Sequence, residues 1–436
     1  MNKERFGNAN YERISARASA AFPGGVLGRH THPDTMQHVP IAGEGAWITD
    51  HSGRRYLDYS CGGGSLILGY SHPEVIRAVN QQVTKATQFV SILNLPALEL
   101  AERVKSAVPW LEQVRFALSA SESIMFAFRM ARAATGREKV LKFNGAYHGN
   151  CDYALWNLSQ DMSENDRQKK PESAGIPKAI EELLLITEYN DVQALTSIVE
   201  NNWREMAAII VEPVQRYYAG EHAFLQKIRE LCDLYDIVMI YDEVVTGFRH
   251  ALGGAAETTG ITPDLSIFGK ALGGGLPVSA VGGREQVLSY GSPDRESPEN
   301  GYCYVTSSQA GNPLGCAAAI ATVEELSRPN VMRNFHDNVN ALKEGLRDIV
   351  KQHNGSAQVV GVGPLWDVVF SDAEIRNART AAAADVTKHR EFHRKLVEQG
   401  VMVRVGNRSY FSTAHQEAEV NFTLNAAANA LEQMAD

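Results

Sequence analysis

The stretch from Asp264 to Gly275 reads DLSIFGKALGGG, and it decides the fold class. Its apolar run, Leu265–Phe268, is typical of a strand buried inside a sheet, and Gly269-Lys270 follows directly. Open α/β sheets bind ligands at the carboxyl ends of their strands, which is where this pattern places Lys270. Burial there lowers the pKa of an amine and makes it a nucleophile, while glycines leave room for a flat ligand. The alternative is a surface lysine in a flexible loop, and this stretch alone leaves both interpretations open.

Short apolar runs alternate with helical patterns on either side of that stretch. Residues 207–211 and 237–241 are predicted strands, and 224–235 is the predicted helix that connects them. Two earlier segments, 73–83 and 96–108, have helical periodicity and begin with proline. This order is typical of an α/β domain with a largely parallel sheet, which we predict for the central part of the chain.

The two ends of the chain follow different patterns. Residues 46–58 predict a β-hairpin with a glycine-containing turn, and the helices after about residue 325 become longer. Residues 359–370 and 401–405 are predicted strands among those helices. We therefore expect a large domain at residues 61–325 and a smaller domain built from residues 1–60 and 326–436.

Composition excludes several classes of function. The chain has 436 residues and a formal net charge of −9, with 44% hydrophobic and 21% charged residues, as in ordinary globular proteins. No basic face is evident, so no nucleic-acid partner is expected. The N-terminus has no apolar signal, and no run approaches the roughly 20 apolar residues of a membrane span, so we expect a cytoplasmic protein without a membrane partner. The five cysteines form no CxxC pair, and His30, His32 and His38 have no acidic helix beside them, so no metal site is predicted.

Two acids, Asp242 and Glu243, follow the predicted strand 237–241. One buried carboxylate at a strand's carboxyl end can hold a pyridine nitrogen protonated, and a pyridinium ring acts as an electron sink. Strand-end acids also bind magnesium. Neither a third acid nor a phosphate loop of the NTPase type accompanies these two, so the pyridine interpretation is favoured.

Two earlier segments suit a phosphate and a flat ring. Ser119-Ala120-Ser121 opens a helical pattern that stops at Gly136, and the free N–H groups at the start of a helix bind anions. Tyr147 lies between small residues, which suits an aromatic ring that stacks on a cofactor. Each segment also has an ordinary structural interpretation, an N-cap or a tight turn. Their order along the chain, ahead of Asp242 and Lys270, favours a cofactor site.

The chain resembles class III aminotransferases of the pyridoxal 5'-phosphate (PLP) fold type I, in the glutamate-1-semialdehyde 2,1-aminomutase-like branch. The resemblance covers roughly residue 22 to the C-terminus, and its most specific stretch is Asp242–Arg284. Shorter similar segments are PGGV (23–26), LGYSHP (68–73), KFNGAYHG (142–149), VEPV (211–214) and GNP (311–313). The resemblance implies a large α/β domain with a mostly parallel sheet, a smaller α+β domain from the N- and C-terminal segments, and PLP as the cofactor.

The resemblance also implies roles for single residues. Lys270 would form the Schiff base with PLP and move the proton, and Asp242 would pair with the pyridine nitrogen. Tyr147 and Val244 would cover the two faces of the ring. The remaining cofactor-binding candidates are Ala120, Ser121, His148, Glu212, Ser307 and Ser308, of which the last two would reach the phosphate in the partner subunit. The implied assembly is a homodimer with shared active sites.

The phosphate-binding segments depart from the family pattern. Ala120 stands where the family has glycine, and Ser308 stands where it usually has threonine. Alanine limits how closely the backbone approaches a phosphate, although it is the mildest such change. A working phosphate site is expected because Lys270 and Asp242 are intact, and a PLP-binding protein without turnover is the alternative.

The predicted activity is transamination between an amino acid or amine donor and a keto or aldehyde acceptor. The alternative is an intramolecular aminomutase, but Asn407 or its neighbour replaces the glutamate that this branch has before its Ser-x-Ala-His-like segment. Arg408 instead resembles an arginine of relatives that act on β-amino acids or D-arylglycines, where it meets a carboxylate. Arg29 is a second candidate for binding the substrate carboxylate, and surface positions are the alternative for both. The polar stretch 157–174 is either a mobile lid or a surface insertion.

Overall fold

A seven-stranded sheet forms the centre of the larger lobe, in the order β4-β14-β13-β12-β9-β5-β8. The computed structural model describes residues 3–28, 38–90, 92–159, 168–353 and 356–435. The strands of the sheet are β4 (Gln113–Ala117), β14 (Ser279–Gly283), β13 (Leu265–Phe268), β12 (Val238–Asp242), β9 (Met206–Val211), β5 (Lys139–Phe143) and β8 (Leu184–Thr187). Neighbours are parallel except for β14, which runs antiparallel to β13 and β4. The predicted mostly parallel sheet is confirmed.

The βαβ unit predicted between residues 207 and 241 is also confirmed. β9 and β12 pair in parallel, and every residue in both strands is buried, which is why both read as continuous apolar runs. Helix α7 (His222–Tyr235) connects them and turns Phe224, Leu225 and Ile228 into the core. As a result β9 and β12 end at the same edge of the sheet.

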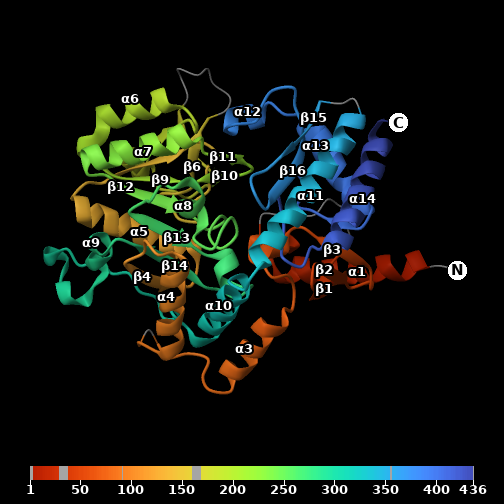
Figure 1. The fold of residues 1–436 in the computed structure, drawn as a ribbon, viewed down its shortest axis with the longest axis horizontal. Coiled ribbons are helices and arrows are strands. Elements are labelled where there is room, and N and C mark those ends of the chain that lie inside the picture. Colours follow the sequence, from red (N-terminus) through yellow and green to blue (C-terminus); the bar gives the residue numbers. More distant parts are fainter. Residues whose placement is uncertain (1–2, 29–37, 91, 160–167, 354–355, 436) are drawn as a thin grey trace.

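Segments from both ends of the chain build the smaller lobe (Figure 1). One sheet contains β1 (Pro40–Glu44), β2 (Trp47–Asp50), β3 (Arg55–Asp58) and β17 (Val401–Met402), and β3 pairs in parallel with β17. The predicted hairpin at residues 46–58 is the antiparallel pair β2–β3. A second sheet contains β15 (Ala357–Val360), β16 (Leu365–Phe370) and β18 (Ser409–Tyr410). Helices α11 (Val331–Gln352), α13 (Val386–Glu398) and α14 (Glu417–Ala435) pack beside these sheets.

The remaining α-helices are distributed over both lobes. The predicted helices at 73–83 and 96–108 are α3 (Pro73–Val83) and α4 (Leu95–Ala107), and α10 (Pro313–Leu326) packs against both. The others are α1 (Lys3–Ala21), α2 (Cys61–Gly64), α5 (Ala120–Thr135), α6 (Val192–Asn202), α8 (Gly254–Thr259), α9 (Glu285–Leu288) and α12 (Ala378–Ala382).

Two short hairpins complete the described strands. β6 (Trp156–Leu158) pairs with β7 (Lys169–Pro171), and β10 (Val214–Gln215) pairs with β11 (Tyr218–Ala219). The stretch 157–174, predicted to be a lid or an insertion, therefore begins in β6 and ends shortly after β7, and its residues 160–167 lie outside the described residues.

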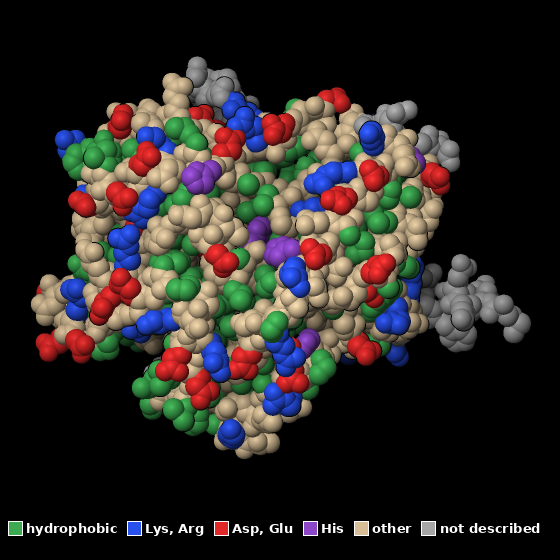
Figure 2. All heavy atoms as spheres, viewed as in Figure 1, with side chains coloured by type: hydrophobic (Ala, Val, Ile, Leu, Met, Phe, Trp, Pro, Cys, Tyr) green, Lys and Arg blue, Asp and Glu red, His purple; other side chains and the backbone are tan. Residues whose placement is uncertain are grey.

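The charge distribution on the surface and the state of the cysteines are those of an ordinary globular protein. Figure 2 shows acidic and basic side chains interspersed across one face of the molecule. All five cysteines are free thiols. Within the described ranges, no helix combines the length and the apolar character that crossing a membrane requires.

Candidate active site

The carboxyl edge of the large sheet borders a cavity of about 390 Å³. The predicted site residues that line it are Ala120, Ser121, Tyr147, Glu212, Asp242, Val244, Lys270 and Arg408. These residues follow the ends of different strands, and they meet because parallel strands end at one edge of a sheet. Arg408 is contributed by the smaller lobe, from the segment just before β18.

Lys270 follows β13 after a single glycine and opens a short 3-10 turn (Lys270–Gly273). Its φ of +44° is an uncommon backbone conformation for a residue with a side chain. Such strained residues cluster at functional sites, where the surrounding structure holds them in place. Burial lowers the pKa of the Lys270 amine, so less energy is needed to make it a neutral nucleophile.

Asp242, the last residue of β12, has its carboxylate fixed from two directions. His148 Nδ1 lies 2.7 Å from one carboxylate oxygen, and the backbone N–H of Val244 donates to the other oxygen over 3.1 Å. His148 was predicted as a cofactor contact. Its side chain is fully buried behind Asp242 and is not among the residues that line the cavity, so it contacts the carboxylate instead.

The start of α5 forms one wall of the cavity. Ser119 caps this helix, since its hydroxyl accepts the N–H of Glu122 and the Glu122 side chain accepts the N–H of Ser119. The Ser121 hydroxyl accepts the N–H of Asn150 over 2.8 Å. Gly149 makes this contact possible, because it has a φ of +83° and a Cβ there would lie 2.6 Å from Ser121 Oγ. The first N–H groups of α5 lack partners within the helix, which suits a phosphate.

Tyr147 and Glu212 lie on another side of the cavity. The Tyr147 side chain is 46% exposed although it is aromatic, and its backbone N–H donates to Glu212 Oε2 over 3.3 Å. Large aromatic side chains normally bury more of their surface, so an accessible ring beside the cavity fits a residue that stacks on a bound ring.

Arg408 places a buried guanidinium at the same cavity. Its Nε donates to the Tyr410 hydroxyl over 3.2 Å, and its Nη1 is buried with no hydrogen-bond partner among the residues that the structure describes. A buried donor on a charged group normally has a partner, so this nitrogen points to an anionic ligand that completes the site.

Tyr410, which contacts Arg408 without lining the cavity, is a residue that the sequence analysis missed. Burial alone would raise the pKa of its phenol, but the charges of Arg408 and Lys270 outweigh burial and lower this pKa to about 7. Tyr410 stands two positions after Arg408, and alternate residues of an extended chain point to the same side. That spacing is the signal that would have identified it.

Besides His148, three further predicted residues are not placed in this cavity. Ser307 and Ser308 are absent from its lining, and the Ser308 carbonyl instead accepts a hydrogen bond from Gln88. Arg29 lies outside the described residues.

A larger cavity of about 1160 Å³ lies between α4, α10 and α11. Its lining includes Arg103, Trp110 and Arg333 but neither Lys270 nor Asp242. The volume of a cavity therefore does not identify the active site. We assign the reaction to the smaller cavity because Lys270 and Asp242 line it.

Comparison with known proteins identifies the class. The family model described as aminotransferase class-III matches residues 30–416, so the chain belongs to the class III aminotransferases. Proteins named glutamate-1-semialdehyde 2,1-aminomutase are similar to it along almost their whole length. That of Methanopyrus kandleri is 37% identical, covering 96% of each chain, and that of Thermomicrobium roseum is 35% identical, covering 95% of this chain and 96% of the relative.

Solved structures show the same fold. An omega-transaminase from Sphaerobacter thermophilus superposes with a TM-score of 0.90 at 28% identity, covering 98% of each chain. A transaminase with PLP bound has a TM-score of 0.86 at 26% identity, covering 99% of this chain and 98% of its own. A glutamate-1-semialdehyde aminomutase from Pseudomonas aeruginosa, at 21% identity and a TM-score of 0.85 over 99% of this chain and 98% of its own, agrees in fold. The predicted PLP fold type I is confirmed.

The cofactor of this class III aminotransferase is PLP. The cavity fits it on the observations above. It offers an amine with a lowered pKa at Lys270, a fixed carboxylate at Asp242, a helix start for the phosphate at α5 and an accessible ring at Tyr147.

Proposed function

We propose that this enzyme transfers an amino group within or between substrates that carry a carboxylate, using PLP held in the 390 Å³ cavity. The observation that carries the proposal is the Arg408 guanidinium. It is buried beside Lys270 and Asp242, and its Nη1 lacks a partner among the described residues. A substrate carboxylate would supply that partner in a charge-assisted hydrogen bond.

When bound, PLP supplies an aldehyde that bonds amines and a ring that accepts electrons from the adjacent carbon. In our proposal Lys270 holds the cofactor through Nζ, and the same amine moves the proton at the reacting carbon once substrate has taken its place. Asp242 keeps the ring nitrogen protonated, and His148 keeps Asp242 in position. Ser121 and the first N–H groups of α5 bind the phosphate, while Tyr147 and Val244 orient the ring.

The first candidate reaction is an aminomutase type of intramolecular transfer. It is favoured by the relatives named glutamate-1-semialdehyde 2,1-aminomutase, which match nearly the whole chain at 35–37% identity. The comparisons thus support the alternative of the sequence analysis better than its first choice. In this reaction both amino positions belong to one substrate, so no second substrate is needed.

The second candidate is a transaminase with separate donor and acceptor. It is favoured by Arg408, which lies next to the position where the aminomutase branch has its glutamate, and by the likeness to the omega-transaminase fold at 28% identity. An arginine there suits donors with a carboxylate near the amine.

One assay separates these reactions. The holoenzyme is incubated with glutamate 1-semialdehyde alone, and then with an amino acid donor in the presence or absence of a keto acid acceptor. Isomerisation of the semialdehyde without acceptor supports the aminomutase. Turnover that requires the acceptor supports the transaminase. A cofactor absorbance that no amine changes would contradict both reactions and would leave a PLP-binding protein without turnover.

We also propose a homodimer with shared active sites. Exposed apolar side chains gather in the segment that connects α3 to α4, namely Phe89, Val90, Ile92, Leu93 and Leu95. Contiguous exposed apolar surface of this kind marks protein interfaces. Gln88 at this surface contacts Ser308, so the loop with the predicted phosphate-binding serines lies beside it. Sedimentation of the holoenzyme tests the dimer. The cytoplasmic location stays a prediction from the sequence.

A further inference from the structure

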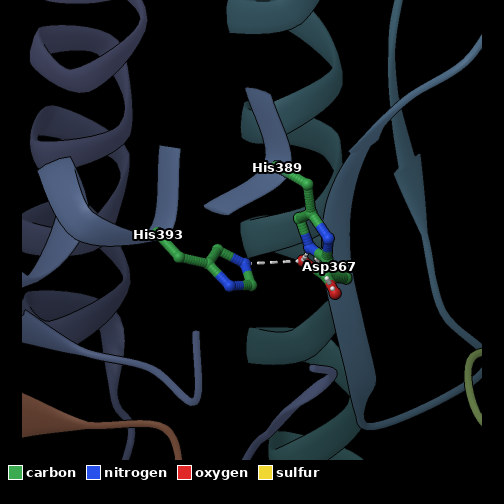
Figure 3. A group of neighbouring side chains, drawn as sticks. All are labelled: Asp367, His389 and His393. Carbon is green, nitrogen blue, oxygen red and sulfur yellow. Dashed lines mark hydrogen bonds and ion pairs between the residues drawn. The ribbon is translucent and has the colours of Figure 1, made fainter. Parts of the chain in front are cut away.

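A buried cluster in the smaller lobe joins Asp367 of β16 to His389 and His393 of α13 (Figure 3). The Asp367 carboxylate lies 3.0 Å from His389 Nε2 and 2.8 Å from His393 Nε2. The two histidines are spaced i, i+4, so they share one face of α13. All three side chains are buried, and the proposed reaction uses none of them directly.

Two histidines and a carboxylate are also a common set of metal ligands. The hydrogen bond at His393 Nδ1, the ring nitrogen that faces away from Asp367, argues against metal binding. A histidine that binds a metal through Nε2 carries its proton on Nδ1 and donates it to an acceptor. Here His393 Nδ1 accepts a hydrogen bond from the backbone N–H of Gly406 over 3.0 Å. The proton of neutral His393 therefore lies on Nε2 and is donated to Asp367.

Gly406 belongs to the turn that leads to Arg408. The N–H of Asn407 donates to the carbonyl of Arg404 over 2.9 Å, and Gly406 has a φ of +73°. The N–H of Arg408 donates to the Asn407 side chain over 2.9 Å. This turn is why the strand predicted at 401–405 ends at Met402.

The same strand holds this turn at two points. β18 begins directly after Arg408 and pairs with β16, the strand that carries Asp367. Asp367 also reaches the turn through His393 and the Gly406 N–H. The backbone on both sides of Asn407 is thus tied to β16, which fixes where the Arg408 side chain begins.

We infer that His393, oriented by Asp367, is a positioning residue that holds the 404–408 turn and thereby places the Arg408 guanidinium in the active-site cavity. The inference rests on the proposed function in one respect, namely that Arg408 binds the substrate carboxylate. Without the His393 acceptor, the Gly406 N–H loses its partner, and the turn is released.

His389 provides a matched control. It lies on the same helix face and binds the same carboxylate, but within the described part of the chain no hydrogen bond joins it to residues 403–408. Two substitutions of His393 separate its contact with Gly406 from its contact with Asp367. Asparagine places an amide oxygen near the Nδ1 position and can still accept from Gly406. Glutamine places its amide near the Nε2 position and keeps the contact to Asp367 only.

The first test measures hydrogen exchange of the backbone amides at residues 403–409 in the holoenzyme. We expect faster exchange in His393→Leu and His393→Gln, and exchange close to wild type in His393→Asn and His389→Leu. Equal changes in His389→Leu and His393→Leu, or no change in either, would show that the cluster is ordinary core structure. This readout does not depend on what Arg408 binds.

The second test measures kinetics with a carboxylate-bearing amine, β-phenylalanine, and with the amine that lacks its carboxylate. We expect His393→Gln to raise KM about fivefold for the first amine, as for the loss of one hydrogen bond, and to leave kcat and the second amine unchanged. Adding His393→Gln to Arg408→Ala should have no further effect, because both act through one contact. An effect of Arg408→Ala that is equal for both amines would contradict the proposed carboxylate site, while amide exchange still decides the positioning role.

A third test asks whether the cluster of Asp367, His389 and His393 binds zinc. We expect Zn²⁺ at equimolar concentration to leave the thermal unfolding of the apo and PLP-bound enzyme unchanged. Stabilisation by Zn²⁺ that disappears in both His389→Leu and His393→Leu would make the cluster a metal site and would overturn the inference.

Discussion

His148 Nδ1 lies 2.7 Å from a carboxylate oxygen of Asp242, and the imidazole is completely buried behind it. We propose that this carboxylate meets the ring nitrogen, which requires a fixed orientation, so substitutions of the two residues should differ in the size of their effect. Asp242→Asn should lower the rate by more than about a hundredfold, since an amide has no charge with which to hold a pyridinium. His148→Leu should cost only about tenfold to a hundredfold, as is typical of residues that orient a functional group. Single-turnover rates at saturating PLP check both, and equal losses would contradict this division of roles.

Lys270→Ala should abolish amino transfer and leave a folded, PLP-binding protein. Lys270 is the lysine that lines the cavity, and its unusual φ of +44° is tolerated by alanine no worse than by lysine. Near-ultraviolet circular dichroism checks the fold. A residual rate above about a hundredth of wild type would contradict the assignment, because it corresponds to a loss of only about 2.7 kcal/mol.

Gly149→Ala should weaken PLP binding without removing any contact to the cofactor. The added Cβ would lie 2.6 Å from Ser121 Oγ, and the φ of +83° disfavours a side chain. Ser121 and the start of α5 would therefore shift away from the position proposed for the phosphate. Gly136→Ala is the control, since Gly136 also has a positive φ but meets nothing within 4 Å. PLP affinity by fluorescence quenching should fall in the first variant only.

The lowered pKa of Tyr410 predicts a pH dependence of substrate binding, because Arg408 still favours the phenolate when Lys270 holds the cofactor. At a pH below the pKa of this phenol the side chain is neutral, so the Arg408 charge is available to a substrate carboxylate. At a pH above it the phenolate partly neutralises that charge, and KM for carboxylate-bearing substrates should rise. Tyr410→Phe should remove this rise. A KM with the same pH profile in both proteins would contradict the coupling of Tyr410 to Arg408.

Ser308→Ala should loosen PLP by one to two decades if its hydroxyl meets the phosphate across a dimer interface. A mixed dimer of Lys270→Ala and Ser308→Ala chains decides which subunit it serves. If Ser308 contacts the phosphate across the interface, both substitutions fall in the same active site. The other site then has both Lys270 and Ser308 and keeps tight PLP binding and activity. Weakened PLP binding in every Lys270-containing site would mean that Ser308 serves its own subunit.

Local patterns predicted the fold well where neighbouring residues determine it. The strands at 207–211 and 265–268 were evident because both faces of a parallel sheet are buried, and the position of Lys270 just after a strand was evident because a strand end is a local signal. The strand at 401–405 was overestimated, because the Gly406 turn depends on a histidine from another element. Asp367 and His393 were missed for the same reason, since only the folded chain brings a strand residue and a helix residue together.

The parallel pairing of β3 with β17 has a consequence for biosynthesis. β3 ends at Asp58 and β17 begins at Val401, so a ribosome releases the β2–β3 hairpin long before the strand that completes its sheet emerges. Contacts between such distant segments form late, because closing a long loop costs entropy. The central α/β domain, which carries Lys270, can therefore fold first during synthesis. At that stage the outer edge of β3 has no partner strand. A nascent chain stalled before residue 401 should expose this hairpin edge to chaperones, and pairing of Val401 and Met402 with β3 should cover it.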